Sequence, residues 1–303
     1  MNKVKTQHYV PRFYLNYFKS SDNKIFVYDK ATDKVFNTAV DNIACENYFY
    51  DSAKFENELQ EEQYLEKYYS SMESEFAPFY SNFISKIESK EKDNISKDDK
   101  KIFSNFLVLQ IDRTKEHREM SRQSYDAVKK QLLEKGFTER QLIDSGFEMK
   151  NPDPKDLHIE SILLGYGMRE AFSEILENHI WILIENNTNH PFFTSDNPIA
   201  KIANIKDEYL SYDGYASEGI EIIFPLNSKY LLALYEREYF KNLEKIENSK
   251  LTISDIENVK YYNSLEIIRS YRQVFSSKNC FEIIPELKKA NPESFKINRK
   301  RIE

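Results

Sequence analysis

The stretch IEIIFPLNSKYLLALYE, residues 220–236, contains two apolar runs separated by a Pro-Leu-Asn-Ser turn sequence. Both runs are rich in β-branched and aromatic residues, which favour strands. Two runs of the same kind precede them, HIWILIENN at 179–187 and PFFTSD at 191–196. This part of the chain is therefore predicted to contain three or four strands.

The remainder of the chain is predicted to be mainly helical. KIFVYDK and KVFNTAV alternate apolar and polar residues around a turn, which predicts a β-hairpin over residues 24–40. Pro78 lies inside the first helical pattern and is expected to kink or divide that helix. The helical patterns lie at about 55–90, 98–128, 157–177, 238–246 and 254–276.

These patterns predict an α+β fold, mainly α-helical with a small, mostly antiparallel sheet. We expect a single domain over residues 1–303, with the alternative that residues 237–303 form a C-terminal helical extension. A chain of this length can bury a sizeable core. Because the sequence contains 21 Phe and 21 Tyr, that core is predicted to be built on large rings.

The composition narrows the range of functions. The net charge of −7 gives no overall basic footprint for binding along duplex nucleic acid without regard to sequence. Cys45 and Cys280 are the only cysteines, too few for a disulfide scaffold, and so we expect a cytoplasmic protein. No apolar stretch approaches the length of a membrane span, and so we expect no membrane partner. Phosphate-loop, dinucleotide-binding and nucleophile-elbow motifs are missing, which disfavours NTPases, dehydrogenases and α/β-hydrolases.

Polar side chains continue the apolar stripe of the helix that is predicted to begin near Asp98. Phe103 and Phe106 define this stripe, and Gln110 and Arg113 extend it. Burying an unpaired neutral polar group costs roughly 1–3 kcal/mol, and burying a charge costs more. An anionic or hydrogen-bonding partner is therefore expected to face this helix.

Two glutamates on the preceding predicted helix are candidate partners. Glu66 and Glu73 lie seven residues apart along one edge of its apolar stripe, and either could pair with Arg113. Such a pair could belong to a functional site. It could equally be a buried Glu–Arg pair that serves only packing specificity.

A second polar segment is PFFTSDNPI, residues 191–199, where an apolar strand stops abruptly. Pro198 disfavours helix at Asn197, and Asp and Asn side chains fold onto local backbone N–H groups, so this segment can be simply a turn. In the alternative, Asp196 and Asn197 stand at a strand end, where sheets commonly present reactive groups to a cleft. Ser195, in the same turn, is then a further candidate for contact with a substrate.

The N-terminal stretch QHYVPRFYLNYF, residues 7–18, places a histidine just before a short aromatic helix. Pro11 suits the first helical turn and leaves His8 outside it, near the helix N-terminus. The positive end of the helix dipole favours a neutral imidazole there. A neutral histidine can act as a base or as a metal ligand, or it can simply anchor the terminus by bonding to the backbone.

Several of these segments together resemble a family of bacterial proteins known as domain of unknown function 4238. The family carries no assigned activity, and so the resemblance supplies candidate positions and no reaction. It spans most of residues 7–235. The matching segments are HYVPRFYL at 8–15, LEKYYSSMES at 65–74, the Gln-x-x-Arg-Thr step at 110–114, TSDNP at 194–198 and FPLNS at 224–228.

The positions that the resemblance supplies are also those that the polar patterns select. One shared polar cleft explains such a set more simply than five separate packing features. We therefore predict that these side chains converge on one cleft that solvent can reach. They are His8, Glu73, Gln110, Arg113 and Asp196.

Our first hypothesis is a hydrolase of phosphodiester bonds, a metal-dependent nuclease that serves as a bacterial defence or toxin effector. Glu73 and Asp196 would hold a divalent cation, Mg²⁺ or Mn²⁺, through oxygen ligands. His8 would act as general base, and Arg113 would stabilise the charge that develops on phosphate. Gln110 is grouped with these catalytic residues.

Two other hypotheses stay open. In the second, the protein is a sensor or binding module, in which Arg113, Gln110 and nearby aromatic residues hold a small anionic or nucleotide ligand without chemistry. In the third, the polar cluster is an internal ion-pair network in a structural protein. The residues predicted to contact a substrate or ligand are Tyr9, Tyr14, Ser195 and Asn197, with Phe49 as a further aromatic candidate.

Overall fold

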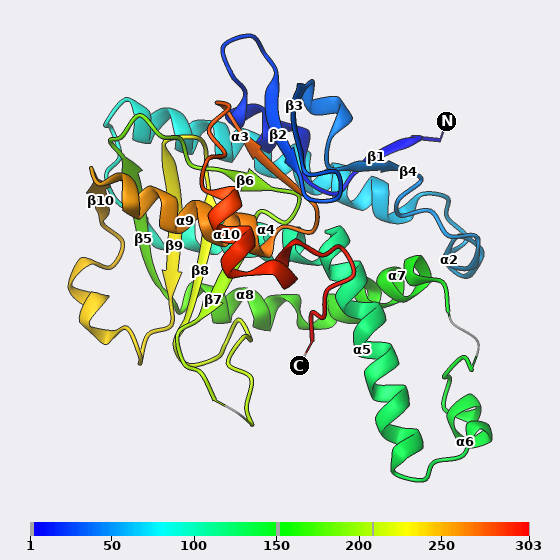
Figure 1. The fold of residues 1–303 in the computed structure, drawn as a ribbon. Helices are drawn as coiled ribbons and strands as arrows, with labels where there is room; N and C mark the ends of the chain where they lie inside the picture. Colours follow the sequence, from blue (N-terminus) through cyan, green and yellow to red (C-terminus); the bar gives the residue numbers. More distant parts are fainter. Residues whose placement is uncertain (1–2, 150–151, 208, 303) are drawn as a thin grey trace.

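The computed structural model describes residues 3–149, 152–207 and 209–302. Its largest sheet has five strands in the order β10-β5-β9-β8-β7 (Figure 1). β10 pairs with β5 in parallel, and the other pairs are antiparallel. The strands are β5 (Ile180–Asn186), β7 (Ala200–Ala203), β8 (Ile220–Pro225), β9 (Tyr230–Tyr235) and β10 (Lys250–Ile253).

The stretch 220–236 forms the β8–β9 hairpin at the centre of this sheet. Ile222 lies opposite Leu234, and every residue of both strands is buried. The Asn227 side chain closes the turn by accepting the backbone N–H groups of Lys229 and Tyr230, each at 2.8 Å. Because both faces of the sheet are covered, these strands read as continuous apolar runs rather than as alternating ones.

Helices cover the two faces of the five-stranded sheet. On one face, α3 (Tyr64–Glu88) and α4 (Lys97–Asp112) share a core with Leu232 and Leu234. On the other face, α9 (Ile256–Arg269) packs against the remaining residues of the same strands. The alternation of side chains along each strand therefore divides the core between the two faces.

Two smaller sheets lie beside the first. A four-stranded antiparallel sheet has the order β3 (Lys34–Thr38), β2 (Ile25–Asp29), β11 (Gln273–Ser276) and β6 (Thr194–Ser195). β1 (Thr6–His8) pairs with β4 (Cys45–Asn47) in a two-stranded antiparallel sheet. The hairpin predicted over 24–40 is confirmed as β2–β3. The α+β class is also confirmed, but the prediction of one small sheet is wrong.

The remaining helices surround these sheets, and α5 projects away from them together with α6 (Figure 1). In the described part of the chain, no helix is both long enough and apolar enough to cross a membrane. The remaining α-helices are α1 (Arg12–Leu15), α2 (Ala53–Leu59), α5 (Lys115–Glu134), α6 (Glu139–Asp144), α7 (Pro154–Gly165), α8 (Arg169–Glu177) and α10 (Ile284–Ala290). The 3-10 helices are η1 (Asn16–Phe18), η2 (Val40–Asn42), η3 (Tyr166–Met168), η4 (Lys241–Ile246) and η5 (Pro292–Phe295).

Several helix predictions need correction. The pattern at 98–128 is two helices, α4 and α5, because Thr114 caps a new helix directly after Arg113. The pattern at 157–177 is likewise divided into α7 and α8 by η3. α3, in contrast, runs through Pro78 without the expected division.

The C-terminal third also differs from its prediction. The pattern at 254–276 is helical only as far as Arg269, and its last residues form β11. β11 lies between β2 and β6, and β10 forms an edge of the five-stranded sheet. In addition to its helices, this segment therefore supplies a strand to each of the two larger sheets.

Candidate functional site

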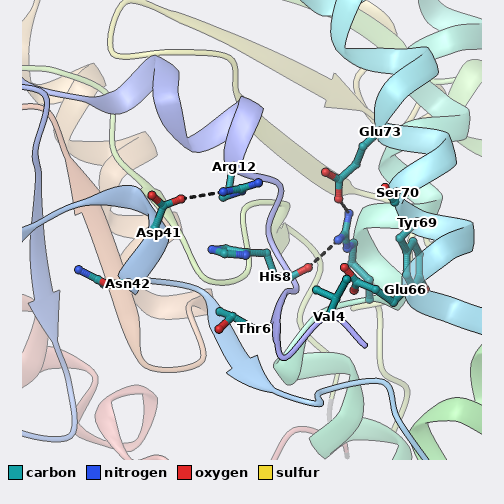
Figure 2. A pocket seen from close by; sticks show the side chains of 11 residues that line it. Val4, Thr6, His8, Arg12, Asp41, Asn42, Glu66, Tyr69, Ser70 and Glu73 are labelled. Carbon is teal, nitrogen blue, oxygen red and sulfur yellow. Dashed lines mark hydrogen bonds and ion pairs between the residues drawn. The ribbon is translucent and has the colours of Figure 1, made fainter. Parts of the chain in front are cut away.

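A pocket of about 450 Å³ lies between the N-terminal segment, the loop after β3, and α3 (Figure 2). Polar and charged side chains dominate its lining, and exposed residues such as Thr6 and Ser70 lie along it. The lining residues are Val4, Thr6, His8, Arg12, Asp41, Asn42, Glu66, Tyr69, Ser70, Glu73 and Arg113.

One face of α3 forms a wall of this pocket. Glu66, Tyr69, Ser70 and Glu73 are spaced at i, i+3, i+4 and i+7, which places them on the same side of a helix. Tyr69 is buried, whereas the two glutamates are half-buried. The seven-residue spacing of the glutamates, visible in the sequence, therefore brings both carboxyl groups to one pocket.

Arg113 fastens this wall to the N-terminal segment. Its Nη1 lies 2.7 Å from Oε1 of Glu73, and its Nη2 donates to the backbone carbonyl of His8 at 2.6 Å (Figure 2). Its Nε donates to Tyr50 Oη at 3.4 Å, and its guanidinium lies over the Tyr69 ring at 4.6 Å. Only 3% of Arg113 is exposed. The predicted partner of this buried charge is therefore present, and all three guanidinium nitrogens bind protein atoms.

His8 ends β1 and lies in the pocket wall, half-buried. Burial lowers its pKa, and the charge of Arg12 lowers the pKa further. Its Nε2 is shielded from solvent and has no hydrogen-bond partner in the described part of the chain. The imidazole is therefore neutral near pH 7, because of its burial and the nearby charge of Arg12.

Glu66 is the glutamate of the pocket whose pKa is shifted toward neutral pH. Burial raises its pKa to about 7, and the nearby carboxylates of Glu73 and Asp51 add to this, while Arg113 opposes it. Glu66 therefore exchanges its proton near neutral pH. The sequence predicted Glu66 only as an ion-pair partner, because nothing local distinguishes it from Glu73.

The rim of the pocket carries an ion pair that the sequence did not predict. Nη1 of Arg12, at the start of α1, donates to Oδ1 of Asp41 in η2 at 2.9 Å (Figure 2). Both side chains are largely exposed, at 62% and 69%. Because these residues are 29 positions apart and individually unremarkable in type, no sequence pattern connects them.

Three other predicted residues support the pocket from behind without lining it. Gln110 is buried, and its Nε2 donates to the backbone carbonyl of Tyr9 at 3.0 Å. The Tyr9 ring packs on Phe49 with a centroid distance of 4.9 Å. Tyr14 is buried below, where its hydroxyl pairs with Thr194 Oγ1 at 2.7 Å. These contacts fix the chain directly after His8.

The predicted TSDNP group does not line the pocket. Asp196 is buried, and its carboxylate accepts the backbone N–H groups of residues 271–273, each at 2.8 Å. Ser195 Oγ accepts the backbone N–H of Asn197 at 3.2 Å, and Asn197 Nδ2 donates to the Arg269 carbonyl at 3.0 Å. These bonds are those of a structural turn, and they hold the loop between α9 and β11.

The expectation of one cleft with all five residues is therefore corrected. The pocket brings together His8, Glu73 and Arg113, places Gln110 behind them, and leaves out Asp196. The predicted pair of metal ligands, Glu73 and Asp196, is accordingly not assembled in this pocket. Among the residues that the structure describes, no group of three or more His, Cys, Asp or Glu side chains is arranged to hold a metal ion.

Comparison with known proteins adds a family and no activity. No curated protein and no solved structure matches the chain. One family model matches residues 6–279. This range contains every residue that lines the pocket apart from Val4. Because the match covers most of the 303 residues, the chain belongs to the family described as protein of unknown function, DUF4238.

Proposed function

We propose that the pocket is the active site of a hydrolase that cleaves phosphodiester bonds, and that the chain is a nuclease serving as a bacterial defence or toxin effector. The observation that carries this proposal is the presence of both Glu66 and His8 in the lining of one pocket. A carboxyl group with a pKa of about 7 and a neutral imidazole line the same pocket, which solvent can reach. Groups that titrate near neutral pH are the ones that transfer protons efficiently there.

The chemistry assigns one proton transfer to each group. His8, whose imidazole is neutral, accepts a proton from the attacking water. The oxygen of that water forms the new bond to phosphorus, and the bond from phosphorus to the leaving oxygen breaks. Glu66, in its protonated form, donates its proton to that leaving oxygen.

Arg113 and Glu73 have positioning roles in this scheme. Arg113 is buried and binds the His8 carbonyl, so it sets the position of the imidazole rather than contacting phosphate. Glu73 holds the guanidinium in turn. Neither proton transfer requires a divalent cation, and so no ligands are assigned to one. The proposal still allows a divalent cation to take part. The assay therefore compares Mg²⁺, Mn²⁺ and a chelator.

The test is hydrolysis of single-stranded DNA, duplex DNA and RNA by the purified protein. Glu66→Gln keeps the size of the side chain and removes its proton, and we expect the rate to fall about 10²–10⁴-fold. Glu75→Gln is the matched control, because Glu75 is exposed on the same helix and does not line the pocket. A Glu66→Gln protein that cleaves as fast as the wild type would overturn the proposal.

The defence or toxin role is tested in cells. We expect expression of the wild-type chain to arrest bacterial growth, and His8→Gln or Glu66→Gln to relieve the arrest. Glu75→Gln should arrest growth as the wild type does. Growth arrest that persists in all three variants would show that the toxicity does not depend on this pocket.

The size of the pocket favours a second candidate function. A volume of about 450 Å³ falls in the range of pockets that hold small molecules, and the lining is polar. A sensor or binding module for a small anionic or nucleotide ligand would fit this volume. A nucleotide that raises the melting temperature equally with and without chelator, and that is recovered intact, would favour this candidate.

A further inference from the structure

The pocket contains two arginines with very different freedom. Each guanidinium nitrogen of Arg113 binds a protein atom, and the side chain is buried. Arg12 is 62% exposed, and within the described residues its guanidinium donates only through Nη1, to Asp41. Arg12 therefore keeps most of its five N–H donors available beside the pocket.

The bond between Arg12 and Asp41 is easily exchanged. Exposed ion pairs contribute little to stability, because water and salt screen them and because both side chains must be ordered. The hydrogen bond from Arg12 lowers the pKa of Asp41, so the carboxylate is charged near neutral pH. Asp41 thus occupies the place on Arg12 that another anion could take.

A second, independent feature lies on the adjoining wall. His8 Nε2 is shielded from solvent and unpartnered in the described part of the chain, and His8 lines the same pocket as Arg12. A neutral imidazole can donate one hydrogen bond to an anionic oxygen. Arginine is also the side chain whose planar donors best match the oxygens of a phosphoryl group.

We propose that Arg12 binds the phosphoryl group of the ligand, and that Asp41 is an internal competitor which this group displaces. This proposal rests on the proposed function in one respect, which is that the ligand is a substrate. It deepens that function by naming the residue that recognises phosphate. The phosphoryl group can come from a free nucleotide or from the backbone of a nucleic acid. Both sources share the chemistry that Arg12 recognises.

The charges that line the pocket predict whether each substitution raises or lowers the affinity for an anion. The charged lining consists of Arg12 and Arg113 against Asp41 and Glu73, with Glu66 neutral below its pKa. Asp41→Asn removes both a negative charge and the competitor, so anion affinity should rise, by up to about 5-fold for an exposed pair. Arg12→Gln removes a charge-assisted bond, so affinity should fall about 10–100-fold.

The experiment measures binding by calorimetry, with no turnover required. The probes are sulfate, a nucleoside monophosphate, and a short single-stranded oligonucleotide. Asp93→Asn and Arg140→Gln are the matched controls, since each changes the net charge equally at an exposed position that does not line the pocket. We expect neither control to change affinity. If only the monophosphate binds, the source is a free nucleotide, and if the oligonucleotide binds more tightly, the source is nucleic acid.

The double variant separates competition from simple charge. Asp41→Asn should strengthen binding in the wild-type chain and have little effect when Arg12 is already Gln, because the competitor then has nothing to occupy. An equal gain in both backgrounds, or binding that survives Arg12→Gln, would overturn the proposal. Sulfate binding needs no turnover, so it is measured independently of hydrolysis. Anion binding that responds to Arg12 without any hydrolysis would therefore end the proposed function and leave this inference standing.

Discussion

At the scale of single residues, the pocket shows how one helix gives two identical side chains different chemistry. Glu73 is held by the guanidinium of Arg113 at 2.7 Å, whereas Glu66 is half-buried without a salt bridge in the described part of the chain. Burial therefore dominates at Glu66 and raises its pKa to about 7. Paired carboxyl groups in unlike environments are typical of acid–base sites.

This pKa predicts how the stability of the protein changes with pH. The pKa of Glu66 is raised above its usual value of 4.5, so its contribution is fully favourable below pH 4.5 and is lost as the pH rises through about 7. Glu66→Gln cannot ionise, so it should be more stable than the wild type above pH 7. We expect a difference of about 1–2 kcal/mol, because partial exposure of Glu66 reduces the full effect of the shift.

Urea unfolding of the wild type and the variant, across this pH range, measures the difference. Subtracting the two curves removes the contributions of all other titrating groups. Glu75→Gln provides the baseline for replacing an exposed glutamate on the same helix. Parallel curves for wild type and Glu66→Gln above pH 4.5 would show that Glu66 has an ordinary pKa.

The sequence predicted some residue contacts and missed others for physical reasons. A polar group on a buried stripe must find a partner, and so the pair of Arg113 with a glutamate could be predicted. Asp196 satisfies that same demand locally, through backbone N–H groups, and its sequence fitted a turn as well as a cleft. Arg12 and Asp41 are exposed, where no such demand exists, so nothing in the sequence linked them.

At the scale of elements, the break between α4 and α5 places Arg113 in the pocket. A continuous helix was predicted over residues 98–128, which contain neither glycine nor proline. Instead, α4 ends at Asp112, and Thr114 adopts an extended backbone with φ −78° and ψ 159°. Thr114 Oγ1 accepts the backbone N–H of His117 at 3.1 Å, which starts α5. The contacts that Arg113 makes with residues distant in the sequence therefore outweigh the local preference for a continuous helix.

This cap predicts a measurable loss of stability. Thr114→Ala removes the side-chain oxygen that binds the first turn of α5, and such substitutions cost about 0.5–2 kcal/mol. Thr114→Ser keeps that oxygen and should lose much less. Thermal and urea unfolding of the two variants measure the difference. Equal stability of Thr114→Ala and Thr114→Ser would mean that the hydroxyl does not cap α5.

The strands differ in how well the local sequence predicts them. β8 and β9 could be predicted because all their residues are buried and form long apolar runs. β11 is only four residues long and continues a helical pattern. Its strand conformation comes from pairing with β2 and β6, which are far away in the sequence. Such long-range pairing cannot be predicted from a short local pattern.

At the scale of the whole molecule, residues 297–301 bind the C-terminal part of the chain back onto α5. Arg299 Nη2 donates to Oε1 of Glu116 at 2.7 Å, and Arg301 Nε donates to Oε2 of the same residue at 3.0 Å. Arg299 also donates to the carbonyls of Ser270 and Tyr271. The loop before β11 is thus held through its carbonyls by Arg299 and through its N–H groups by Asp196.

Glu116 is the shared partner in this arrangement, and its loss should therefore affect more than one contact. The exposed fractions of the side chains are 12% for Glu116, 9% for Arg299 and 2% for Arg301. Glu116→Gln leaves two nearly buried guanidinium groups without a carboxylate, and breaking a buried pair in this way costs about 3–5 kcal/mol. Asp126→Asn, on the same helix, removes one partner of an exposed pair and should cost no more than about 0.5 kcal/mol.

Urea unfolding measures this cost, and an arginine-specific protease locates it. Cleavage after Arg299 requires the segment to leave Glu116, so Glu116→Gln should be cut there much faster than the wild type, while Asp126→Asn should be cut at the wild-type rate. Glu116, Arg299 and Arg301 do not line the pocket. Glu116→Gln should therefore still bind anions under conditions in which it is folded. If Glu116→Gln unfolds and is cleaved as the wild type is, the two arginines must be stabilised by the carbonyls alone, and the carboxylate does not fasten this segment to α5.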